Sequence, residues 1–216
     1  MSTEGKRTVV IVDDHPIVRQ GLAQLIAHEN DLEVVAEAGD ARTGIEAVQS
    51  FAPDAVIVDL MLKDSSGIEL IKEIKATSPE ARILVVSMHD EAVYAERALR
   101  AGAHGYIMKQ EATNDVLNAL RKVLSDDVYV SKEVVSRMLR RMVGGGPSAG
   151  IDRLSDRELE VFQWIGHGLS VGEIAEKLKV SPKTIETYRA HIKEKLGLAS
   201  ATDVLRVAVT WLEQKT

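Results

Sequence analysis

The sequence has no cysteine among its 216 residues. This absence excludes a disulfide framework and a thiolate metal site, and it fits a reducing cytosol. No apolar stretch approaches the roughly 20 residues of a membrane-spanning helix, and residues 1–7 lead into a strand-like run without a signal-peptide core. We therefore expect a soluble, cytoplasmic protein that does not associate with membranes.

A general excess of positive charge is also missing, because the formal net charge is −6. Residues 1–126 carry 21 acidic and 13 basic side chains, residues 127–151 carry 2 and 4, and residues 152–216 carry 10 of each. Bulk charge therefore gives no argument for nucleic-acid binding in the last third of the chain, where such a role has to depend on local clusters. The length suits two small domains, each with its own core.

Common catalytic motifs are absent as well. The sequence contains neither Gly-x-Ser-x-Gly nor His-Glu-x-x-His. The glycine run Gly144–Gly146 is followed by Pro147 and joins no strand to a helix, so it does not predict a phosphate-binding loop. The chemistry of the chain has to be sought in the polar residues that follow its strands.

Short β-branched runs alternate with helical patterns up to about residue 126. Five continuous apolar runs suit strands that are buried on both faces: Thr8–Val12, Glu33–Ala38, Ala55–Val58, Arg82–Val86 and Gly105–Met108. Apolar residues at helical spacing fill the intervals: Ile17–His28, Ala41–Phe51, Gly67–Ala76, Glu91–Ala101 and Thr113–Leu124. Residues 8–126 are therefore predicted to form an α/β domain with a doubly wound, five-stranded parallel sheet of the flavodoxin-like kind.

The rest of the chain is predicted to be helical. Residues 127–151 form a linker with a helix over Lys132–Met142 and a flexible stretch over Gly144–Gly150. Residues 152–216 are expected to be an all-α domain of four helices: Ser155–His167, which opens with a capping box, Ser170–Leu178, Ser181–Leu196 and Ala201–Glu213.

Acidic, hydroxyl and ammonium side chains directly follow four of the expected strands. They are Asp13, Asp14, Asp59, Ser87 and Lys109. The carboxyl ends of parallel strands meet at one edge of an open sheet, where ligands bind. Two or three carboxylates and a backbone carbonyl suffice for Mg²⁺, and a lysine and a hydroxyl can bind phosphoryl oxygens. The combination predicts phosphoryl transfer to a carboxylate with the help of a divalent cation.

Each of these residues also has a simpler interpretation when it is taken alone. Asp13 and Asp14 can cap the following helix, and Asp59 can be a turn residue. Ser87 can cap a helix, and Lys109 can be a solvated charge. The phosphoryl-transfer interpretation depends on their occurring together at successive strand ends.

Residues 8–126 resemble the receiver domain of bacterial two-component response regulators. The resemblance is carried by Val9–Pro16, with its acidic pair, and by the segment from Asp59 to Gly67. It implies that Asp59 accepts a phosphoryl group. The implied ligands of Mg²⁺ are Asp14, Asp59, the carbonyl of Met61 and, through water, Asp13.

The same resemblance assigns three further residues. It implies that Ser87 is a switch hydroxyl, Tyr106 a switch aromatic and Lys109 a phosphoryl-binding lysine. The chain departs from the family at Lys63, where a proline is usual, which concerns the rigidity of the loop. Two histidines lie near the site, His15 and His89. We interpret them as surface or cap residues and not as phosphoacceptors.

The segment from Leu169 to Tyr188 has the proportions of two short helices joined by a tight turn. The second helix and its N-terminal turn would present polar residues suited to phosphate and base-edge contacts in a major groove. With one lysine from the first helix, they are Lys177, Ser181, Lys183, Thr184, Glu186, Thr187, Arg189, Ala190 and Lys193. Six basic residues against two acidic ones between Lys177 and Lys195 give the local clustering that bulk charge lacks. Glu186 could accept a hydrogen bond from a cytosine amino group or repel phosphate.

An ordinary helical bundle with a mixed surface is the simpler interpretation of this part, and composition alone favours it. However, residues 152–216 look like the LuxR-type helix-turn-helix domain, from Leu154–Val161 through Glu173–Ala175 and Val180–Ile185 to Lys195–Gly197. The two resemblances together make the chain similar to a full-length response regulator of the NarL/FixJ type.

This resemblance implies a transcriptional regulator that a sensor histidine kinase phosphorylates on Asp59. Self-catalysed phosphorylation and dephosphorylation of that residue would be its only enzymatic activity. The phosphorylated form is expected to be a homodimer that binds paired half-sites on double-stranded DNA. Two alternatives stay open: a Mg²⁺-dependent phosphatase or phosphotransferase of small molecules, and a DNA-binding regulator that is independent of phosphorylation.

Overall fold

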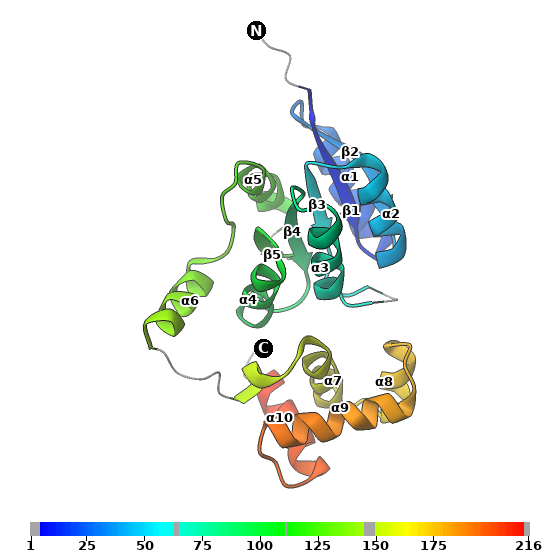
Figure 1. The fold of residues 1–216 in the computed structure, drawn as a ribbon, viewed down its shortest axis with the longest axis vertical. Coiled ribbons are helices and arrows are strands. Elements are labelled where there is room, and N and C mark those ends of the chain that lie inside the picture. The colour runs from blue at the N-terminus through cyan, green and yellow to red at the C-terminus, as the bar shows by residue number, and fades with distance from the viewer. Residues whose placement is uncertain (1–4, 63–64, 111, 145–149, 214–216) are drawn as a thin grey trace. The chain divides into compact units, whose positions relative to one another are not determined.

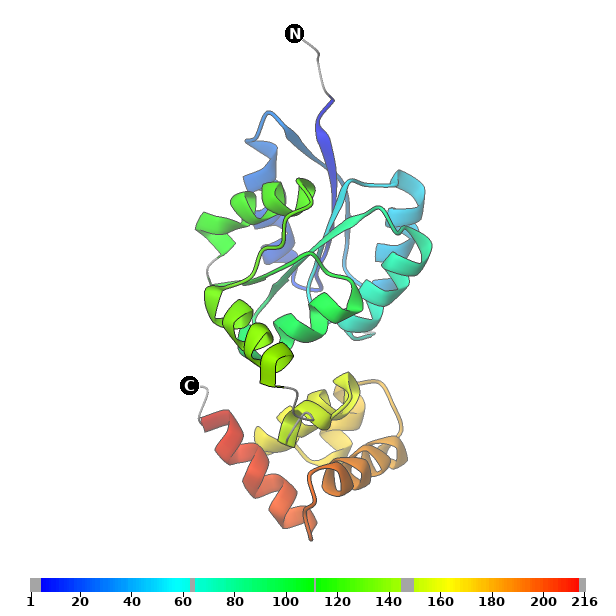
Figure 2. The same cartoon turned by 60° about the vertical axis from the view of Figure 1, so that its left-hand side comes forward.

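A computed structural model describes residues 5–62, 65–110, 112–144 and 150–213. Its contacts divide the chain into two compact units, Met1–Val143 and Gly144–Thr216. Each unit is described by itself (Figures 1 and 2). None of the described helices is both long and apolar enough to cross a membrane.

The first unit is built on a parallel sheet of five strands in the order β2-β1-β3-β4-β5. The strands are β1 Arg7–Val12, β2 Leu32–Ala38, β3 Ala55–Val58, β4 Arg82–Ser87 and β5 Gly105–Met108. The helices that follow them in turn are α1 Pro16–Ala27, α2 Ala41–Phe51, α3 Gly67–Thr77, α4 Glu91–Ala101 and α5 Ala112–Leu124. These bounds agree with the predicted ones to within one residue at each end, and the predicted fold class is confirmed.

Helices cover both faces of the sheet (Figure 1). Alternate strand residues, among them Val9 and Ile11, form a buried core cluster with residues of α1 and α5. Helices α2, α3 and α4 pack in series on the other face. Strands that are buried on both faces need continuous apolar sequences, and all four residues of β3 are fully or almost fully buried.

The register of the strands brings the polar strand ends together. Val12 at the end of β1 lies opposite Val58 at the end of β3, and the Asp59 N–H donates to the Val12 carbonyl at 2.9 Å. At the other side of the site, the Lys109 N–H donates to the Ser87 carbonyl at 2.8 Å. The sheet therefore carries its polar residues at one edge, as the sequence predicts.

The chain after α5 stays attached to the first unit. Tyr129 forms an isolated parallel bridge with Gly105 of β5, and α6 follows over Lys132–Gly144. The domain boundary that we predicted near residue 126 remains a prediction. The first compact unit of the structure continues through α6 as far as Val143. The flexible stretch predicted over Gly144–Gly150 falls, for residues 145–149, outside the described residues.

The second unit consists of a short 3₁₀ turn, Gly150–Arg153, and four α-helices, which confirms the predicted all-α domain. The helices are α7 Asp156–Gly166, α8 Val171–Lys177, α9 Pro182–Lys195 and α10 Ala201–Glu213. The predicted capping box at the start of α7 is present, and α8 has a second one. Phe162 and Trp211 pack with ring centroids 5.7 Å apart, and Ile174, Ile185 and Ile192 are completely buried.

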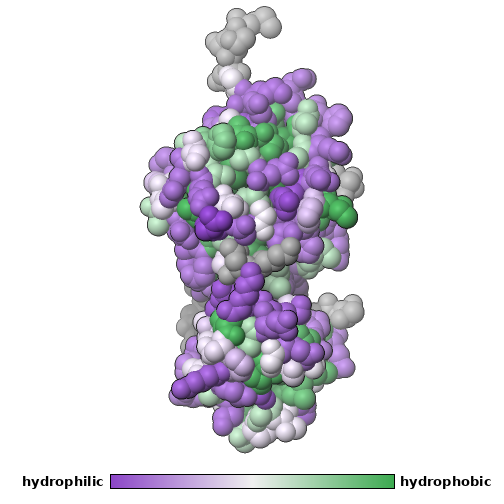
Figure 3. Space-filling view, turned by 90° about the vertical axis from the view of Figure 1, so that its right-hand side faces the viewer, coloured by the Kyte–Doolittle hydropathy of each residue, from purple (hydrophilic) through white to green (hydrophobic). Residues whose placement is uncertain are grey.

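Hydrophilic side chains dominate the face of the molecule shown in Figure 3, with apolar residues between them in small groups. Some large apolar side chains of the described residues are well exposed, such as Ile17, Met88 and Leu139. The cores of the two units account for most of the other apolar residues. Single exposed apolar side chains are common in soluble folds and indicate no particular function.

Gly67 at the start of α3 fits only because it has no side chain. A Cβ at this position would lie 2.3 Å from the Asp59 carbonyl oxygen and 2.5 Å from Leu60 Cα. Both distances are far shorter than a van der Waals contact. The atoms involved belong to the backbone of Asp59 and Leu60, which cannot shift without moving the acidic site. The loop that carries Asp59 therefore depends on a glycine at residue 67.

We expect Gly67→Ala to lower the free energy of unfolding of the first unit by about 2–4 kcal/mol, because the new methyl group overlaps backbone atoms. Gly21→Ala is the matched control, since no atom lies within 4 Å of the Cβ position at Gly21 in α1. This control should stabilise the unit by about 0.5–1 kcal/mol. Differential scanning calorimetry of the full chain measures both effects, and an equal effect of the two substitutions would contradict the steric account.

Candidate phosphoryl-acceptor site and candidate DNA interface

The predicted acidic site is assembled at the carboxyl edge of the sheet. Asp13 and Asp59 are almost completely buried, with 1% and 2% of their surfaces exposed. The Lys109 ammonium lies between them, with Nζ 2.7 Å from Asp13 Oδ2 and 2.6 Å from Asp59 Oδ2. Only 7% of the Lys109 side chain is exposed, so it is not the solvated charge that its sequence position alone would allow.

Burial and charge act in opposite directions on this group. Burial raises the pKa of the Asp59 carboxyl, and the charge and hydrogen bond of Lys109 offset part of this effect. Burial by itself lowers the pKa of Lys109, but the Asp59 charge and the hydrogen bonds to Asp13 and Asp59 raise it above its ordinary value. Lys109 therefore stays protonated and supplies the positive charge that the two carboxylates require.

The donor atoms of the site fit a hard divalent cation. Carboxylate oxygens of Asp13, Asp14 and Asp59 and a ring nitrogen of His15 lie within 4.8 Å of one another. Asp14 Oδ1 is buried and takes part in no hydrogen bond among the described residues, although it lies 2.7 Å from His15 Nδ1. A buried carboxylate oxygen without a donor is suited to a cation, and oxygen ligands are those that Mg²⁺ prefers.

The capping interpretations of the acidic pair and of Ser87 do not describe the structure. The N-cap residue of α1 is His15, and no side chain caps that helix. Asp13 Oδ1 instead accepts from the backbone N–H of His15 at 2.8 Å. For α4 the N-cap residue is Asp90, whose side chain accepts from Ala92 N–H.

Ser87 and Tyr106 lie next to each other beside the acidic group. Ser87, the last residue of β4, is completely buried, and its Oγ accepts from the His89 N–H at 3.3 Å. Tyr106 is 1% exposed, and its hydroxyl donates to the His89 carbonyl at 2.9 Å. Burial raises the pKa of Tyr106 well above its ordinary value, which keeps the hydroxyl available as a donor. The side chain of His89, which we expected to be a surface or cap residue, is half-buried, and its backbone contacts both Ser87 and Tyr106.

Part of the phosphoacceptor loop lies outside the described residues. That part holds Lys63, where the chain departs from the family, and Asp64 beside it. On either side of these positions the loop is held by the Met61 N–H, which donates to Asp59 Oδ1 at 3.3 Å, and by a bridge between Met61 and Ser66.

In the second unit, α8 and α9 form the two helices of the predicted helix-turn-helix. Ser181 caps α9 and accepts from the Thr184 N–H at 3.1 Å. Lys179 in the connecting turn has a φ of 51°, in the left-handed region that favours glycine. The predicted DNA-contacting residues that are exposed are Lys177, Ser181, Lys183, Glu186, Thr187, Ala190 and Lys193, and the half-buried ones are Thr184 and Arg189.

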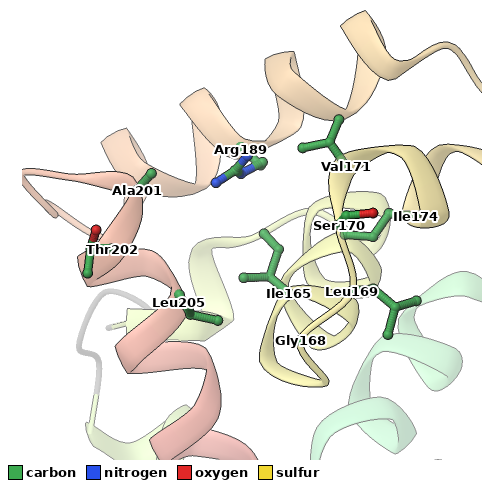
Figure 4. A pocket seen from close by; sticks show the side chains of 10 residues that line it. All are labelled: Ile165, Gly168, Leu169, Ser170, Val171, Ile174, Arg189, Ala201, Thr202 and Leu205. Carbon is green, nitrogen blue, oxygen red and sulfur yellow. The ribbon is translucent and has the colours of Figure 1, made fainter.

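Arg189 is one of the two half-buried residues among those predicted to contact DNA. Its side chain lines a cavity of about 270 Å³ whose other walls come from α7, α8 and α10 (Figure 4). Its guanidinium also donates to Glu186 at 3.2 Å. Lys183 and Lys193, in contrast, lie exposed on α9. Arg189 therefore takes part in the packing around this cavity, and it lines a second hollow together with Glu186, Ala190 and Lys193.

Glu158 is a structural residue whose main contact the sequence did not predict. Besides completing the capping box of α7, its carboxylate accepts from Lys195 Nζ at 2.6 Å and lies 3.6 Å from His191 Nδ1. Both partners belong to α9. Glu158 therefore joins the start of α7 to the end of the candidate recognition helix. The contact could not be predicted because residues 158 and 195 lie far apart in the sequence.

A buried acidic site on a doubly wound sheet, followed by a helix-turn-helix unit, defines a signal-receiving regulatory protein. Residues 9–121 match the family model of the response regulator receiver domain, and residues 152–208 match that of the bacterial regulatory proteins of the luxR family. The chain belongs to the two-component response regulators with a LuxR-type DNA-binding domain.

Known proteins share this organisation along most of their length. The Fimbriae Z protein of Salmonella typhimurium is 37% identical over 201 residues, which cover 93% of this chain and 95% of that protein. The oxygen regulatory protein NreC of Staphylococcus aureus is 36% identical over 208 residues, 93% of this chain and 96% of that one. A structure of RcsB from Salmonella enterica serovar Typhimurium, bound to promoter rprA with the phosphomimetic BeF3⁻, has a TM-score of 0.65 at 33% identity and covers 94% of this chain and 98% of its own.

The Glu158 contact makes a prediction about pH. Burial alone would raise the pKa of Glu158, but the hydrogen bonds from Lys195 and Ser155 lower it below its ordinary value of 4.5. A carboxyl group with a lowered pKa in the folded state stabilises the fold above its unfolded pKa, and this stabilisation is lost as the pH falls through the folded value. We expect Glu158→Gln to reduce the free energy of unfolding of the second unit by about 1–3 kcal/mol at neutral pH, with a smaller difference in acid.

Urea unfolding followed by tryptophan fluorescence isolates this effect, because both tryptophans of the chain, Trp164 and Trp211, belong to the second unit. Glu173→Gln is the matched control: Glu173 has the same capping-box position in α8, and its described contacts are with Ser170 alone. Equal losses for Glu158→Gln and Glu173→Gln, or a Glu158→Gln loss that does not change with pH, would contradict the assigned contact.

Proposed function

We propose that the chain is a transcriptional regulator whose DNA binding is controlled by phosphorylation of Asp59. The observation that carries this proposal is the buried group of Asp59, Asp13 and Lys109, with the hydroxyl of Ser87 at the same edge of the sheet. No residue of this group is needed to cap the neighbouring helices α1 and α4.

Asp59 acts as the nucleophile toward a phosphohistidine of a sensor histidine kinase. A carboxylate oxygen of Asp59 forms a bond to phosphorus while the phosphorus–nitrogen bond of the donor breaks, and the imidazole nitrogen leaves with the electron pair. Lys109 and Ser87 bind oxygens of the transferred group. Asp14, Asp59, the Met61 carbonyl and, through water, Asp13 would hold Mg²⁺, which would offset the negative charge of the phosphoryl group.

The phosphoryl group acts on a conformational equilibrium in our proposal. The structure has Tyr106 buried, with its hydroxyl bonded to the backbone of His89. A contact between Ser87 and a phosphoryl oxygen would favour this buried conformer of Tyr106 over an exposed one. The loop from Ser87 to Asp90 and the start of α4 would then carry the change to the surface of the receiver.

The second unit binds DNA through α9. Lys183 and Lys193 are exposed on this helix, and Ser181 and Lys183 lie at its N-terminal turn, where backbone N–H groups can meet phosphate. A small number of phosphate contacts gives useful affinity only when two copies bind neighbouring half-sites, so we propose a homodimer of the phosphorylated form. A structure of RcsB bound to promoter rprA and another of two RcsB dimers bound to two parallel DNAs support this arrangement.

Asp59→Asn is expected to abolish modification by a small phosphodonor or by beryllofluoride with Mg²⁺, because the amide is not a nucleophile for phosphorus. Intact-mass spectrometry measures the label. Asp54→Asn is the control, since Asp54 binds Arg7 and Thr8 before β3 begins and should leave labelling intact. Persistent labelling of Asp59→Asn would refute the site assignment.

Beryllofluoride should increase the DNA affinity of the whole protein by about ten- to hundredfold, because dimerisation turns the second half-site contact into an intramolecular event. Gel-shift titration on a duplex selected with the treated protein measures this increase. A fragment of residues 150–216 should bind this duplex less tightly than the treated whole protein. Equal affinity of the treated and untreated proteins would instead support a regulator that does not respond to phosphorylation.

A further inference from the structure

The segment that leaves the receiver is bonded to the strand that carries Tyr106. The Tyr106 N–H donates to the Tyr129 carbonyl at 2.7 Å, and the Tyr129 N–H donates to the His104 carbonyl at 3.0 Å. Tyr129 thereby continues the sheet at the outer edge of β5. Lys122 of α5 lies over its ring, 5.4 Å from the centroid.

The next residues are bonded to the start of α4. The Ser131 N–H donates to Glu91 Oε1 at 2.7 Å. One turn into α6, the Arg137 guanidinium donates to the Ala92 carbonyl. Val134, between these two contacts, is 3% exposed. Helix α6 lies next to α4 in both ribbon views (Figures 1 and 2).

These contact points adjoin the groups that we assign to phosphate sensing. Ser87 Oγ accepts from the His89 N–H, and the Tyr106 hydroxyl donates to the His89 carbonyl. Glu91 and Ala92, which hold the segment, follow His89 by two and three residues. A change at Ser87 or Tyr106 thus reaches the docking point through two or three peptide units of one loop.

We propose that residues 129–137, here called the latch, form a phosphorylation-dependent docking element that fixes α6 to the receiver when Tyr106 is buried. This inference rests on the proposed function, because it makes the buried Tyr106 conformer the one that phosphorylation favours. The latch is bonded to β5 through backbone atoms and to α4 through one carboxylate and one guanidinium. When the hydrogen bond from the Tyr106 hydroxyl to the His89 carbonyl breaks, the contacts of the latch with Glu91 and Ala92 of α4 are lost. The backbone bonds between Tyr129 and β5 remain.

The contacts are suited to a reversible element. Val135 and Leu139 of α6 remain 43% and 55% exposed, so the docked helix buries only one narrow face. Each hydrogen bond that involves a charged group contributes only modestly to stability, because water competes for both partners. The free energy of a few such contacts is comparable to the differential binding energy by which a phosphoryl group shifts a two-state equilibrium. Phosphorylation can therefore decide whether they form.

Docking of the latch changes how the two units are joined. With the latch docked, the connection between the units begins at the end of α6. With the latch released from α4, it begins near Tyr129. A shorter connection confines the second unit to a smaller volume around the receiver and raises its effective concentration at the neighbouring half-site of a dimer. Phosphorylation would therefore act on DNA binding through the length of the connection as well as through dimerisation.

Hydrogen–deuterium exchange of the full chain with and without beryllofluoride and Mg²⁺ tests the latch. We expect amides of residues 131–140 to exchange about tenfold more slowly in the treated protein, which corresponds to about 1.4 kcal/mol. Arg137→Ala and Glu91→Ala should each remove most of this protection. Arg140→Ala and Glu133→Ala are the matched controls, because both residues are exposed on α6, and they should retain it.

Tyr106→Phe separates the latch from phosphate binding. It should still take up beryllofluoride on Asp59, as intact-mass spectrometry would show, but should lose the added protection of residues 131–140. Unchanged or faster exchange of these residues in treated wild-type protein that carries the label would overturn the proposal. If Asp59 takes up no label, the proposed function fails first. The latch is then decided in untreated protein, where faster exchange in Arg137→Ala than in Arg140→Ala supports the α4 contact and equal exchange refutes it.

Discussion

Two almost completely buried carboxylates, Asp13 and Asp59, share one buried ammonium in this protein, and the architecture of the first unit serves that contact. Two carboxylates in a low-dielectric edge of a sheet repel each other, and burial penalises each of them. Lys109 reduces both penalties, but one positive charge cannot neutralise two. The site keeps an excess of negative charge, which a bound cation would offset. A group of this kind stabilises the fold less than an apolar core would, which is consistent with a functional purpose.

The constraints on the neighbouring backbone follow from that contact. Asp59 has to leave β3 at the level where Asp13 leaves β1, and the backbone bond from Asp59 to Val12 sets this level. The chain then has to return to α3 so closely that Gly67 leaves no room for a Cβ. On the other side, the backbone bond from Lys109 to Ser87 ties the lysine to β4, the strand that ends with the Ser87 hydroxyl. Main-chain bonds of the sheet therefore position the carboxylates, the ammonium and the hydroxyl, and the contacts of Lys109 with Asp13 and Asp59 fix its side chain.

Much of this arrangement could be predicted from the sequence, because it follows from strand order and from the rule that parallel strands end at one edge. The alternation of apolar runs with helical patterns located the strands and helices of the sheet domain, and serine caps marked the starts of α7 and α9 in the second unit. Contacts between distant positions could not be predicted in this way. The pair Glu158–Lys195 and the bond from Ser131 to Glu91 join ordinary charged or polar residues whose partners depend on how helices pack. The close approach at Gly67 is likewise a property of three dimensions, since glycine also precedes helices in turns and caps where nothing approaches it closely.

The two units solve the problem of small size differently. The receiver has a five-stranded sheet with helices on both faces. Its large apolar core can offset the free-energy cost of burying the polar site. The second unit has four short helices and a small core, and a domain of this size is only marginally stabilised by apolar burial. Side-chain caps are accordingly common at its helix ends. The Glu158 carboxylate makes two contacts of this kind, because it completes the capping box of α7 and binds Lys195 in the last turn of α9. The helix that we propose to read DNA is thus held at its N-terminus by Ser181 and at its C-terminus by Lys195. Because both ends of α9 are held, the phosphate contacts that we propose for the exposed Lys183 and Lys193 would cost side-chain entropy but little backbone entropy.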